Sequence, residues 1–542
     1  MARSYSVSFV TLLGIVVGVF AGLVAEALLR AINFISDTVY YGHVSSAIMP
    51  PGAAPFHYWH ILLPAIGGLA VGLIAHYFCP EVAGDGIPEA MSVVLKNRSV
   101  VKANVGFLKP LTAAITVGTG GPFGAEGPIL QTGGALGSLL SMLFPCTPAE
   151  RRTLLACGAA AGLAAVFKTP FAAALLAVEL LVCEYRPRSF LPITVSSIVG
   201  TLMAMAFRGT AVVFPVKSDY HLYALELPFF VLLGILCAGA AWVMKKALYS
   251  CEEFIERRLS RWWFPFIPAA GGLCVGLIAL WHSEVLGTGY AVIADLLARP
   301  HPLHELVGIG VAKLMAFSVA LGSGASGGTF APALMIGGSL GAAFGGLVHL
   351  VIGHNAATIG LYGMVATAAL FGSLYRATPS AVLFMLEVTG AFNALLPLLI
   401  VCVVAALVMY YISETSINTE RLVRRGQLVP EAYTVNPMRL HRVADVMSPG
   451  INTPAEHIVY ADEILHNVIP RLLDAHAELC AVLDRKGQRV GTLTVLDILS
   501  AHEWEYSQEI PEPGLLRFRR WSTPTPVGKL RSDESVSAEI YQ

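Results

Sequence analysis

Residues 109–143 read KPLTAAITVGTGGPFGAEGPILQTGGALGSLLSML, an apolar segment that glycine and proline interrupt around a single carboxylate, Glu126. A charged side chain in the middle of such a segment is costly in a membrane and is usually retained for function. A bilayer tolerates the Gly/Pro break only where the irregular backbone is buried in protein or lines a polar cavity. The segment therefore predicts a broken membrane helix with a functional carboxylate at the break.

The composition of the whole chain agrees with a membrane protein. Of its 542 residues, 55% are hydrophobic and 13% are charged, and the mean hydropathy is +0.67. Soluble domains carry about 25% charged residues, and a membrane span needs about 20 apolar residues. We expect an all-α polytopic membrane protein, because apolar stretches of near-spanning length recur at Val10–Leu29, Ile61–Tyr77, Leu154–Val182, Phe229–Val243 and Leu395–Tyr411.

The chain also repeats itself. When residues 109–143 are laid over the segment that starts at Lys313, at a fixed offset of 204, identical residues align in at least nine places. These include Lys109 with Lys313, Gly124 with Gly328 and Pro128 with Pro332. Two halves with breaks at matching positions are typical of transporters whose binding site lies at the repeat interface. We therefore expect two inverted-topology repeats, at about 60–210 and 264–412.

Three segments share one design, in which a Gly/Pro loop leads directly into a helix: GDGIP (84–88), GAEGP (124–128) and GTFAP (328–332). The first backbone N–H groups of a helix lack partners and carry partial positive charge, so they attract anions. Proline in the first turn gives up no needed N–H, and glycine permits close approach of the backbone to an ion. The pattern predicts an anion pathway, in which Glu126 either occupies an anion position as a gate or only caps its helix.

These segments resemble the CLC family of chloride channels and proton-coupled chloride exchangers, whose signatures G-S-G-I-P, G-x-E-G-P and G-x-F-x-P occur in the same order. The flanking segments PEVAGDGIPEA, KTPFAAALLAVEL and YRATPSAVLFMLEVTG are also similar to the family. The resemblance implies a homodimer with one anion pathway in each subunit, gated by Glu126. It further implies that backbone around the three helix starts binds the anion, at Asp85, Gly86, Ile87, Gly124, Ala125, Gly127, Gly328, Phe330 and Ala331.

The chain departs from the family at three positions. Asp85 replaces the serine of G-S-G-I-P, and it is protonated, turned away as a helix cap, or a second titratable gate. Asn418 stands in the place of the central tyrosine, so the phenolic contact is lost while the amide can still donate to the bound anion. Leu180 follows Glu179 where many exchangers have a second glutamate that relays protons; Glu184 is a candidate substitute, or an interfacial charge near Arg186. Chloride or a similar small anion is the expected substrate, with protons as a second substrate if the chain is an exchanger.

The domain organisation follows from the charge distribution. Residues 441–542 hold 25 of the 71 Asp, Glu, Lys and Arg residues. We expect a membrane domain over 1–425, a linker over 426–439, a soluble α/β unit over 440–505 that resembles one CBS motif, and a flexible tail over 506–542. CBS motifs can bind adenine nucleotides, although this one is equally compatible with a stabilising role without ligand.

The remaining predictions concern location and alternative functions. Basic residues that follow the last span, Arg421, Arg424 and Arg425, place the tail in the cytoplasm by the positive-inside rule. We expect both termini on the cytoplasmic side of a bacterial inner membrane, in contact with lipid and without nucleic acid. Neither a clustered metal site nor an enzyme motif is evident. The alternative function is a membrane-embedded sensor or enzyme that signals through the CBS-like tail.

Overall fold

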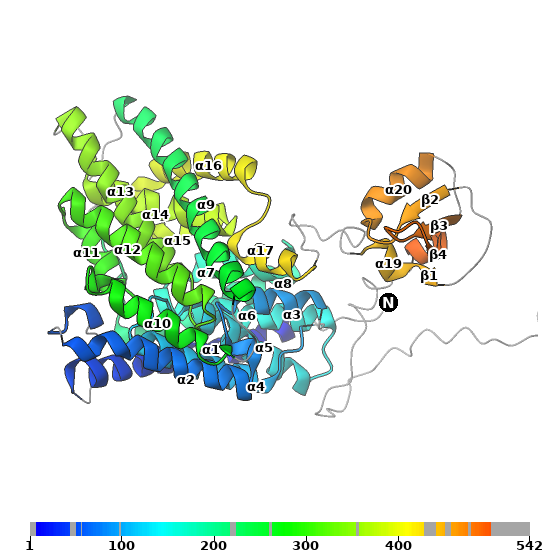
Figure 1. The fold of residues 1–542 in the computed structure, drawn as a ribbon, viewed down its shortest axis with the longest axis horizontal. Helices are drawn as coiled ribbons and strands as arrows, with labels where there is room; N and C mark the ends of the chain where they lie inside the picture. The colour runs from blue at the N-terminus through cyan, green and yellow to red at the C-terminus, as the bar shows by residue number, and fades with distance from the viewer. Residues whose placement is uncertain are drawn as a thin grey trace, which may run out of the picture.

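The computed structural model describes residues 7–43, 50–55, 57–96, 99–216, 224–258, 263–353, 357–427, 441–449, 457–474 and 479–499. Its helices form one large domain, and a small α/β unit follows them in the chain (Figure 1). The helices of the large domain are α1 (Val7–Ser36), α2 (Leu63–Tyr77), α3 (Ile87–Lys96), α4 (Ala103–Gly118), α5 (Glu126–Leu143), α6 (Pro148–Phe167), α7 (Pro170–Ala177), α8 (Pro187–Arg208), α9 (Leu227–Arg258), α10 (Ile267–Ile278), α11 (Tyr290–Ala298), α12 (Leu303–Gly322), α13 (Phe330–Ile352), α14 (Ile359–Tyr375), α15 (Thr378–Thr389), α16 (Leu395–Ile412) and α17 (Ile417–Arg424).

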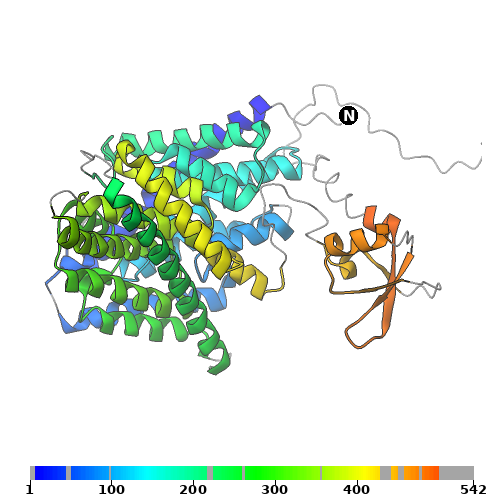
Figure 2. The same cartoon turned by 90° about the horizontal axis from the view of Figure 1, so that it is seen from above.

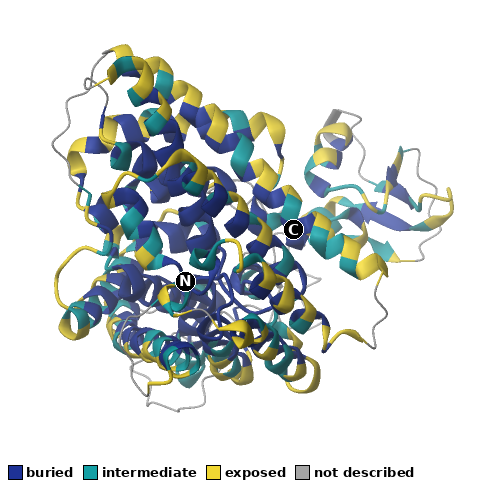
Figure 3. Cartoon of the chain, turned by 60° about the vertical axis from the view of Figure 1, so that its left-hand side comes forward, coloured by how far each residue is buried: buried dark blue, intermediate teal, exposed yellow. Residues whose placement is uncertain are grey.

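The large domain has the helix lengths and the surface of a membrane protein. Within the described ranges, seven helical segments are long and apolar enough to cross a bilayer, and four shorter apolar helices accompany them. Buried residues fill the interior, and the outer faces are exposed (Figure 3). Large apolar side chains lie on these outer faces, such as Phe20 on α1, Leu202 on α8 and Val403 on α16. An apolar exterior of this kind suits contact with lipid, and the all-α prediction is confirmed.

The two halves meet through equivalent residues. Helices α2 and α10 pack side by side, and an added Cβ atom on Gly68 would lie 2.2 Å from the carbonyl oxygen of Pro268. The corresponding atom on Gly272 would lie 2.1 Å from the carbonyl oxygen of Pro64. Gly68 and Gly272, and likewise Pro64 and Pro268, are related by the offset of 204 that the sequence repeat showed, so the repeat extends to the contact between the halves. Small residues are common where membrane helices pack this closely.

One predicted apolar stretch is wrong as a single segment. The sequence runs without a charge from Leu154 to Phe167, but α6 ends there and Lys168 takes a left-handed backbone conformation with φ +58°. Pro170 then begins α7. The break arises because proline clashes with a continuing helix and biases the residue before it away from helical geometry.

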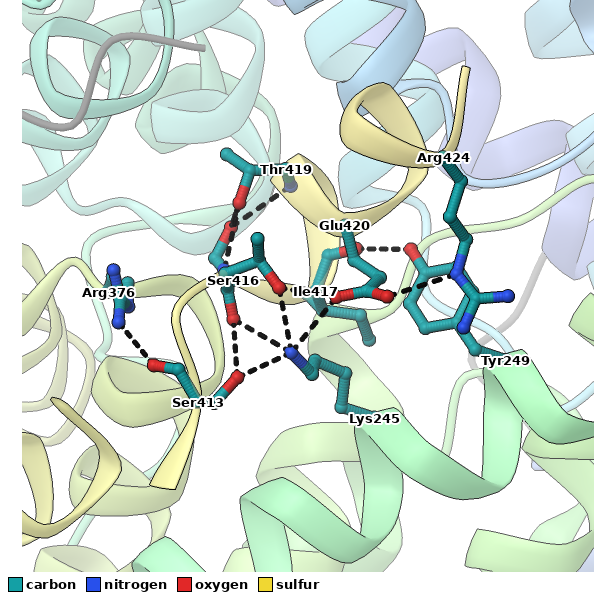
Figure 4. Close-up of polar contacts among 10 residues, drawn as sticks. Lys245, Tyr249, Arg376, Ser413, Ser416, Ile417, Thr419, Glu420 and Arg424 are labelled. Carbon is teal, nitrogen blue, oxygen red and sulfur yellow. Dashed lines mark hydrogen bonds and ion pairs between the residues drawn. The ribbon is translucent and has the colours of Figure 1, made fainter. Parts of the chain in front are cut away.

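Helix α17 returns the chain against the large domain after α16. A polar cluster holds it there (Figure 4): the Lys245 ammonium of α9 donates to Ser413 Oγ at 2.5 Å and to Glu420 Oε2 at 3.2 Å. The Ser416 hydroxyl caps α17 by accepting from the Thr419 N–H at 3.1 Å. The Tyr249 hydroxyl of α9 donates to the carbonyl oxygen of Ile417. These contacts position the arginines of α17.

The small unit combines a four-stranded sheet with short helices (Figure 2). Its strands lie in the order β1-β4-β3-β2; β2 and β3 are parallel, and the other pairs are antiparallel. The unit has its own apolar core, which includes Val459, Val482 and Leu493. Its elements are α19 (Val443–Val446), β1 (Ser448–Pro449), β2 (His457–Tyr460), α20 (Leu465–Asp474), β3 (Leu479–Leu483) and β4 (Arg489–Thr494). The predicted small α/β tail is confirmed, whereas most of the linker and the segment 506–542 lie outside the described residues.

Candidate functional site

The three Gly/Pro loops lead into helices as predicted, and the three helix starts converge. Helices α3, α5 and α13 begin at Ile87, Glu126 and Phe330. The loops before α5 and α13 exchange two backbone hydrogen bonds: Gly124 N–H donates to Gly328 O at 3.1 Å, and Gly328 N–H donates to Gly124 O at 2.9 Å. The loop before α3 joins them, because Gly84 N–H donates to Ala325 O at 3.1 Å.

Two fully buried lysines, Lys109 and Lys313, bind loop carbonyl oxygens in equivalent ways. Lys109 Nζ donates to the carbonyl oxygens of Val82 and Gly84 at 3.0 and 2.7 Å. Lys313 Nζ donates to those of Val285 and Gly287 at 2.9 and 3.2 Å. Carbonyl oxygens of loops in a membrane domain need donors, since unpaired polar groups are costly there. The lysines that match in the sequence repeat therefore have matching structural roles.

Glu126 is the first residue of α5 and is completely buried. Its Oε1 atom accepts a hydrogen bond of 2.5 Å from the hydroxyl of Tyr290 at the start of α11. Its Oε2 atom lies against the start of α13, where an added Cβ atom on Gly328 would be 2.9 Å away and the Ala331 N–H faces the carboxylate. The carboxylate thus lies beside the start of α13, where backbone donors suit an anion, although the structure shows no hydrogen bond to Oε2.

Asp85 is also buried, and it contacts the same helix start. Its Oδ1 and Oδ2 atoms accept hydrogen bonds from the N–H and the hydroxyl of Thr329, at 3.0 and 3.3 Å. On its other side, an added Cβ atom on Gly127 would lie 2.4 Å from Oδ1. Asp85 therefore caps α13 of the other half and not α3, the helix that follows it in the chain. At the start of α3, Glu89 Oε2 accepts from Gly86 N–H at 3.2 Å.

The position of the family's central tyrosine looks different from what the sequence predicted. Asn418 is buried on α17, and the structure shows no side-chain hydrogen bond from its Nδ2 atom. A tyrosine nevertheless reaches the site, because the hydroxyl of the fully buried Tyr375, at the end of α14, contacts the hydroxyl of Thr329. Tyr375 also stacks edge-on against Phe330, with 4.7 Å between ring centroids. The sequence predicted the loss of a phenolic contact at Asn418, whereas Tyr375 of α14 brings a phenol to Thr329.

The two candidate proton-relay glutamates lie in other surroundings. Glu184 forms ion pairs with Arg152 at 3.1 Å and with Arg186 at 2.8 Å, which agrees with the alternative of an interfacial charge. Glu179 Oε2 accepts a hydrogen bond of 2.6 Å from the hydroxyl of Ser380. Leu180, at the position of the family's second glutamate, is buried. The relay role of Glu184 and Glu179 stays a prediction.

The sequence reasoning missed three hydroxyl side chains of the site: Tyr290, Thr329 and Tyr375. Two of them had a visible signal. Tyr290 directly follows Gly287-Thr288-Gly289, the counterpart of the GDG loop, and Thr329 lies inside the GTFAP segment. Tyr375 is the first residue of the YRATPSAVLFMLEVTG segment, in which no anion-binding pattern marks it.

Metal and thiol chemistry receive no support from the described part of the chain. It contains no group of three or more His, Cys, Asp or Glu side chains placed to hold a metal ion. Most cysteines are buried as expected, but Cys274 on α10 is exposed. In the tail unit, burial raises the pKa of the Cys480 thiol, which reduces its reactivity.

Comparison with known proteins decides the family. The family model described as voltage gated chloride channel matches residues 67–410, which include all three helix starts. The chain belongs to this family. Among relatives of this CLC protein, the H(+)/Cl(-) exchange transporter ClcA of Yersinia pestis bv. Antiqua (strain Angola) is 29% identical over 426 residues, which cover 77% of this chain and 87% of that protein.

Other similar proteins include a channel and a solved antiporter. The chloride channel protein CLC-f of Arabidopsis thaliana is 28% identical over 421 residues, covering 72% of this chain and 52% of that protein. The crystal structure of a slow cyanobacterial Cl-/H+ antiporter superposes with a TM-score of 0.69 at 22% identity, covering 77% of this chain and 97% of the other. This likeness confirms the CLC fold. The family match covers the large domain only and ends before the CBS-like unit.

Proposed function

We propose that this chain transports chloride or a similar small anion across the membrane, through a pathway that the starts of α3, α5 and α13 surround and Glu126 gates. The observation that carries the proposal is the buried carboxylate of Glu126 against the start of α13. An ionised carboxylate there takes the place of an anion. Protonation or displacement of Glu126 frees that position, and the transported anion occupies it.

The relatives support anion transport and are compatible with two mechanisms, proton-coupled exchange and channel conduction. The names of ClcA and CLC-f describe an exchange transporter and a channel. This chain has Leu180 at the position where many exchangers carry a relay glutamate. Reconstituted liposomes separate the mechanisms: proton movement driven by an imposed chloride gradient identifies an exchanger, and chloride flux without proton movement identifies a channel. The alternative of a membrane-embedded sensor or enzyme requires that no anion flux occurs.

The substitution Glu126→Gln tests the gate. Glutamine keeps the size of the side chain and removes its charge, so the variant resembles the protonated state at every pH. We expect the contribution of Glu126 to acid activation to be lost, so that chloride efflux from liposomes rises less on acidification than in the wild type. At pH 7.5 the flux should be at least as high as that of the wild type. A pH response identical to that of the wild type would refute the gating role.

The finer predictions on assembly and location are part of this proposal. The family resemblance supports a homodimer with one pathway in each subunit, and crosslinking in lipid vesicles tests it. The arginines of α17, which the Lys245 cluster positions, support a cytoplasmic tail in a bacterial inner membrane. The α/β fold of the tail supports the CBS assignment, and titration with ATP in the presence of the full chain tests adenine-nucleotide binding.

A further inference from the structure

Two carboxylates, not one, lie against the start of α13. Glu126 faces the backbone of Gly328 and Ala331, and Asp85 accepts both donors of Thr329. Donors at a helix start stabilise a negative charge whether a side chain or a free ion supplies it. An ionised Asp85 therefore holds donors that a transported anion would otherwise use, at a second position in the same pathway.

Charged and titratable groups from several elements surround Asp85. The strongest attraction comes from Lys109, and Arg421 adds to it. Glu89 and Glu126 repel it, and Tyr375 and Tyr249 also interact with it electrostatically. The cations on α4 and α17 compensate the charge of the buried carboxylate. A buried carboxylate needs such compensation in order to stay ionised.

A cavity of about 750 Å³ leads from the α17 side of the domain to the loop that carries Asp85. Its lining includes Gly84 and Glu89, the neighbours of Asp85 in the chain, together with Glu252, Glu256 and Arg421. Arg421 lies close to this loop, because an added Cβ atom on Gly84 would be 2.4 Å from the guanidinium Nη1 atom. Solvent on this side therefore comes within one residue of Asp85.

Titratable groups continue from the cavity to the buried carboxylate. Arg421 Nη2 pairs with Glu252 Oε1 at 3.0 Å, and Arg421 Nη1 lies 3.8 Å from Glu89 Oε1. The other oxygen of Glu89 accepts from Gly86 N–H, on the residue after Asp85. Glu252 lines the cavity, and Glu89 connects the cavity to the GDGIP loop that carries Asp85.

We propose that Asp85 is a second gate of the pathway, a tethered anion that protonation from this cavity releases. One proton from solvent binds the carboxylate, the neutral acid competes only weakly for the N–H and hydroxyl of Thr329, and one transported anion takes its place beside these donors. The site then holds the same net charge as before, because a neutral acid and a free anion replace the carboxylate. The inference rests on the proposed anion transport and adds to it a proton-binding residue where the family pattern has a serine.

Chloride efflux from liposomes tests the inference in a chain that carries Glu126→Gln, so that the first gate does not titrate. Asp85 should then make flux rise on acidification between pH 8.5 and 5.5, by up to about tenfold per pH unit above its titration midpoint. Adding Asp85→Ser should give flux that is high at pH 8.5 and independent of pH. The matched control Glu256→Gln removes a carboxylate from the same cavity and should keep the rise.

A binding measurement guards against variants that merely transport poorly. In the Glu126→Gln background, calorimetric titration of the full-length protein with chloride should show weaker binding at pH 8.5 than at pH 5.5 when Asp85 is present, and equal binding at both pH values once Asp85→Ser is added. A pH-dependent flux and affinity that persist unchanged in Asp85→Ser would overturn the second gate and leave anion transport standing. An absence of flux in every protein, wild type included, would overturn both.

Discussion

At the scale of single residues, the hydrogen bond from Tyr290 to Glu126 controls how easily the proposed gate opens. A phenol that donates to a carboxylate stabilises its ionised form, which is the form that blocks the anion position. In Tyr290→Phe, Glu126 should accept a proton more easily. We therefore expect acid activation of chloride flux to begin at higher pH, by roughly 1 unit for a lost hydrogen bond to a charged group.

The control for this prediction is Tyr362→Phe. Tyr362 is also a fully buried tyrosine that donates to a glutamate, but its acceptor is Glu226 at 3.1 Å. Its removal should leave the pH profile of the flux in place. A midpoint that stays constant in Tyr290→Phe, or moves toward lower pH, would contradict a role for Tyr290 in holding the gate closed.

At the scale of elements, the convergence of helix starts depends on a glycine. An added Cβ atom on Gly127 would lie 2.3 Å from the backbone oxygen of Asp85 and 2.4 Å from its Oδ1 atom. Gly127→Ala should therefore push α5 and the GDGIP loop apart and lower chloride flux by about tenfold or more, since small displacements of a binding geometry have effects of this size. Gly239→Ala on α9, where nothing lies within 4 Å, should leave flux unchanged. Equal flux in both variants would show that the close contact is not required.

The loop lysines lead to a stability prediction for the same elements. Lys313→Met keeps the length of the side chain but leaves the carbonyl oxygens of Val285 and Gly287 without their donor. A buried acceptor left unpaired costs about 1–3 kcal/mol, so the variant should unfold at a clearly lower temperature in detergent. Lys102→Met is the matched control, because that lysine makes a mostly exposed ion pair with Glu81, and exposed pairs contribute little to stability. Equal unfolding temperatures for the two variants would contradict the loop-holding role.

At the scale of the whole molecule, the tail unit and the membrane domain have separate apolar cores. Val482→Asp places an unpaired charge in the small core, where Val482 is fully buried, and such a change costs several kcal/mol. We expect the tail to become sensitive to limited proteolysis while chloride flux persists. If chloride flux is lost when the tail unfolds, the pathway needs a folded tail. The control is Leu496→Asp, at an exposed position of the tail.

Much of the architecture was predictable because the relevant signals are local in the chain. Gly, Pro and apolar runs determine where α3, α5 and α13 begin, since backbone conformation there depends on neighbouring residues. The repeat offset also predicted that Lys109 and Lys313 are equivalent, and their contacts are indeed equivalent. The same signals identified Glu126 as the residue at a helix start.

The partners of the two carboxylates were not predictable. Asp85 and Thr329 lie 244 positions apart, and Tyr290 and Glu126 lie 164 apart. No local pattern links such residues, because only the packing of the two halves brings them within hydrogen-bonding distance. For the same reason the phenol near Thr329 comes from Tyr375 on α14 and not from the segment around Asn418. The sequence by itself determined the membrane class, the repeat and the helix starts; the tertiary structure alone decided which donors each buried carboxylate meets, because those distances depend on the folding of the whole chain.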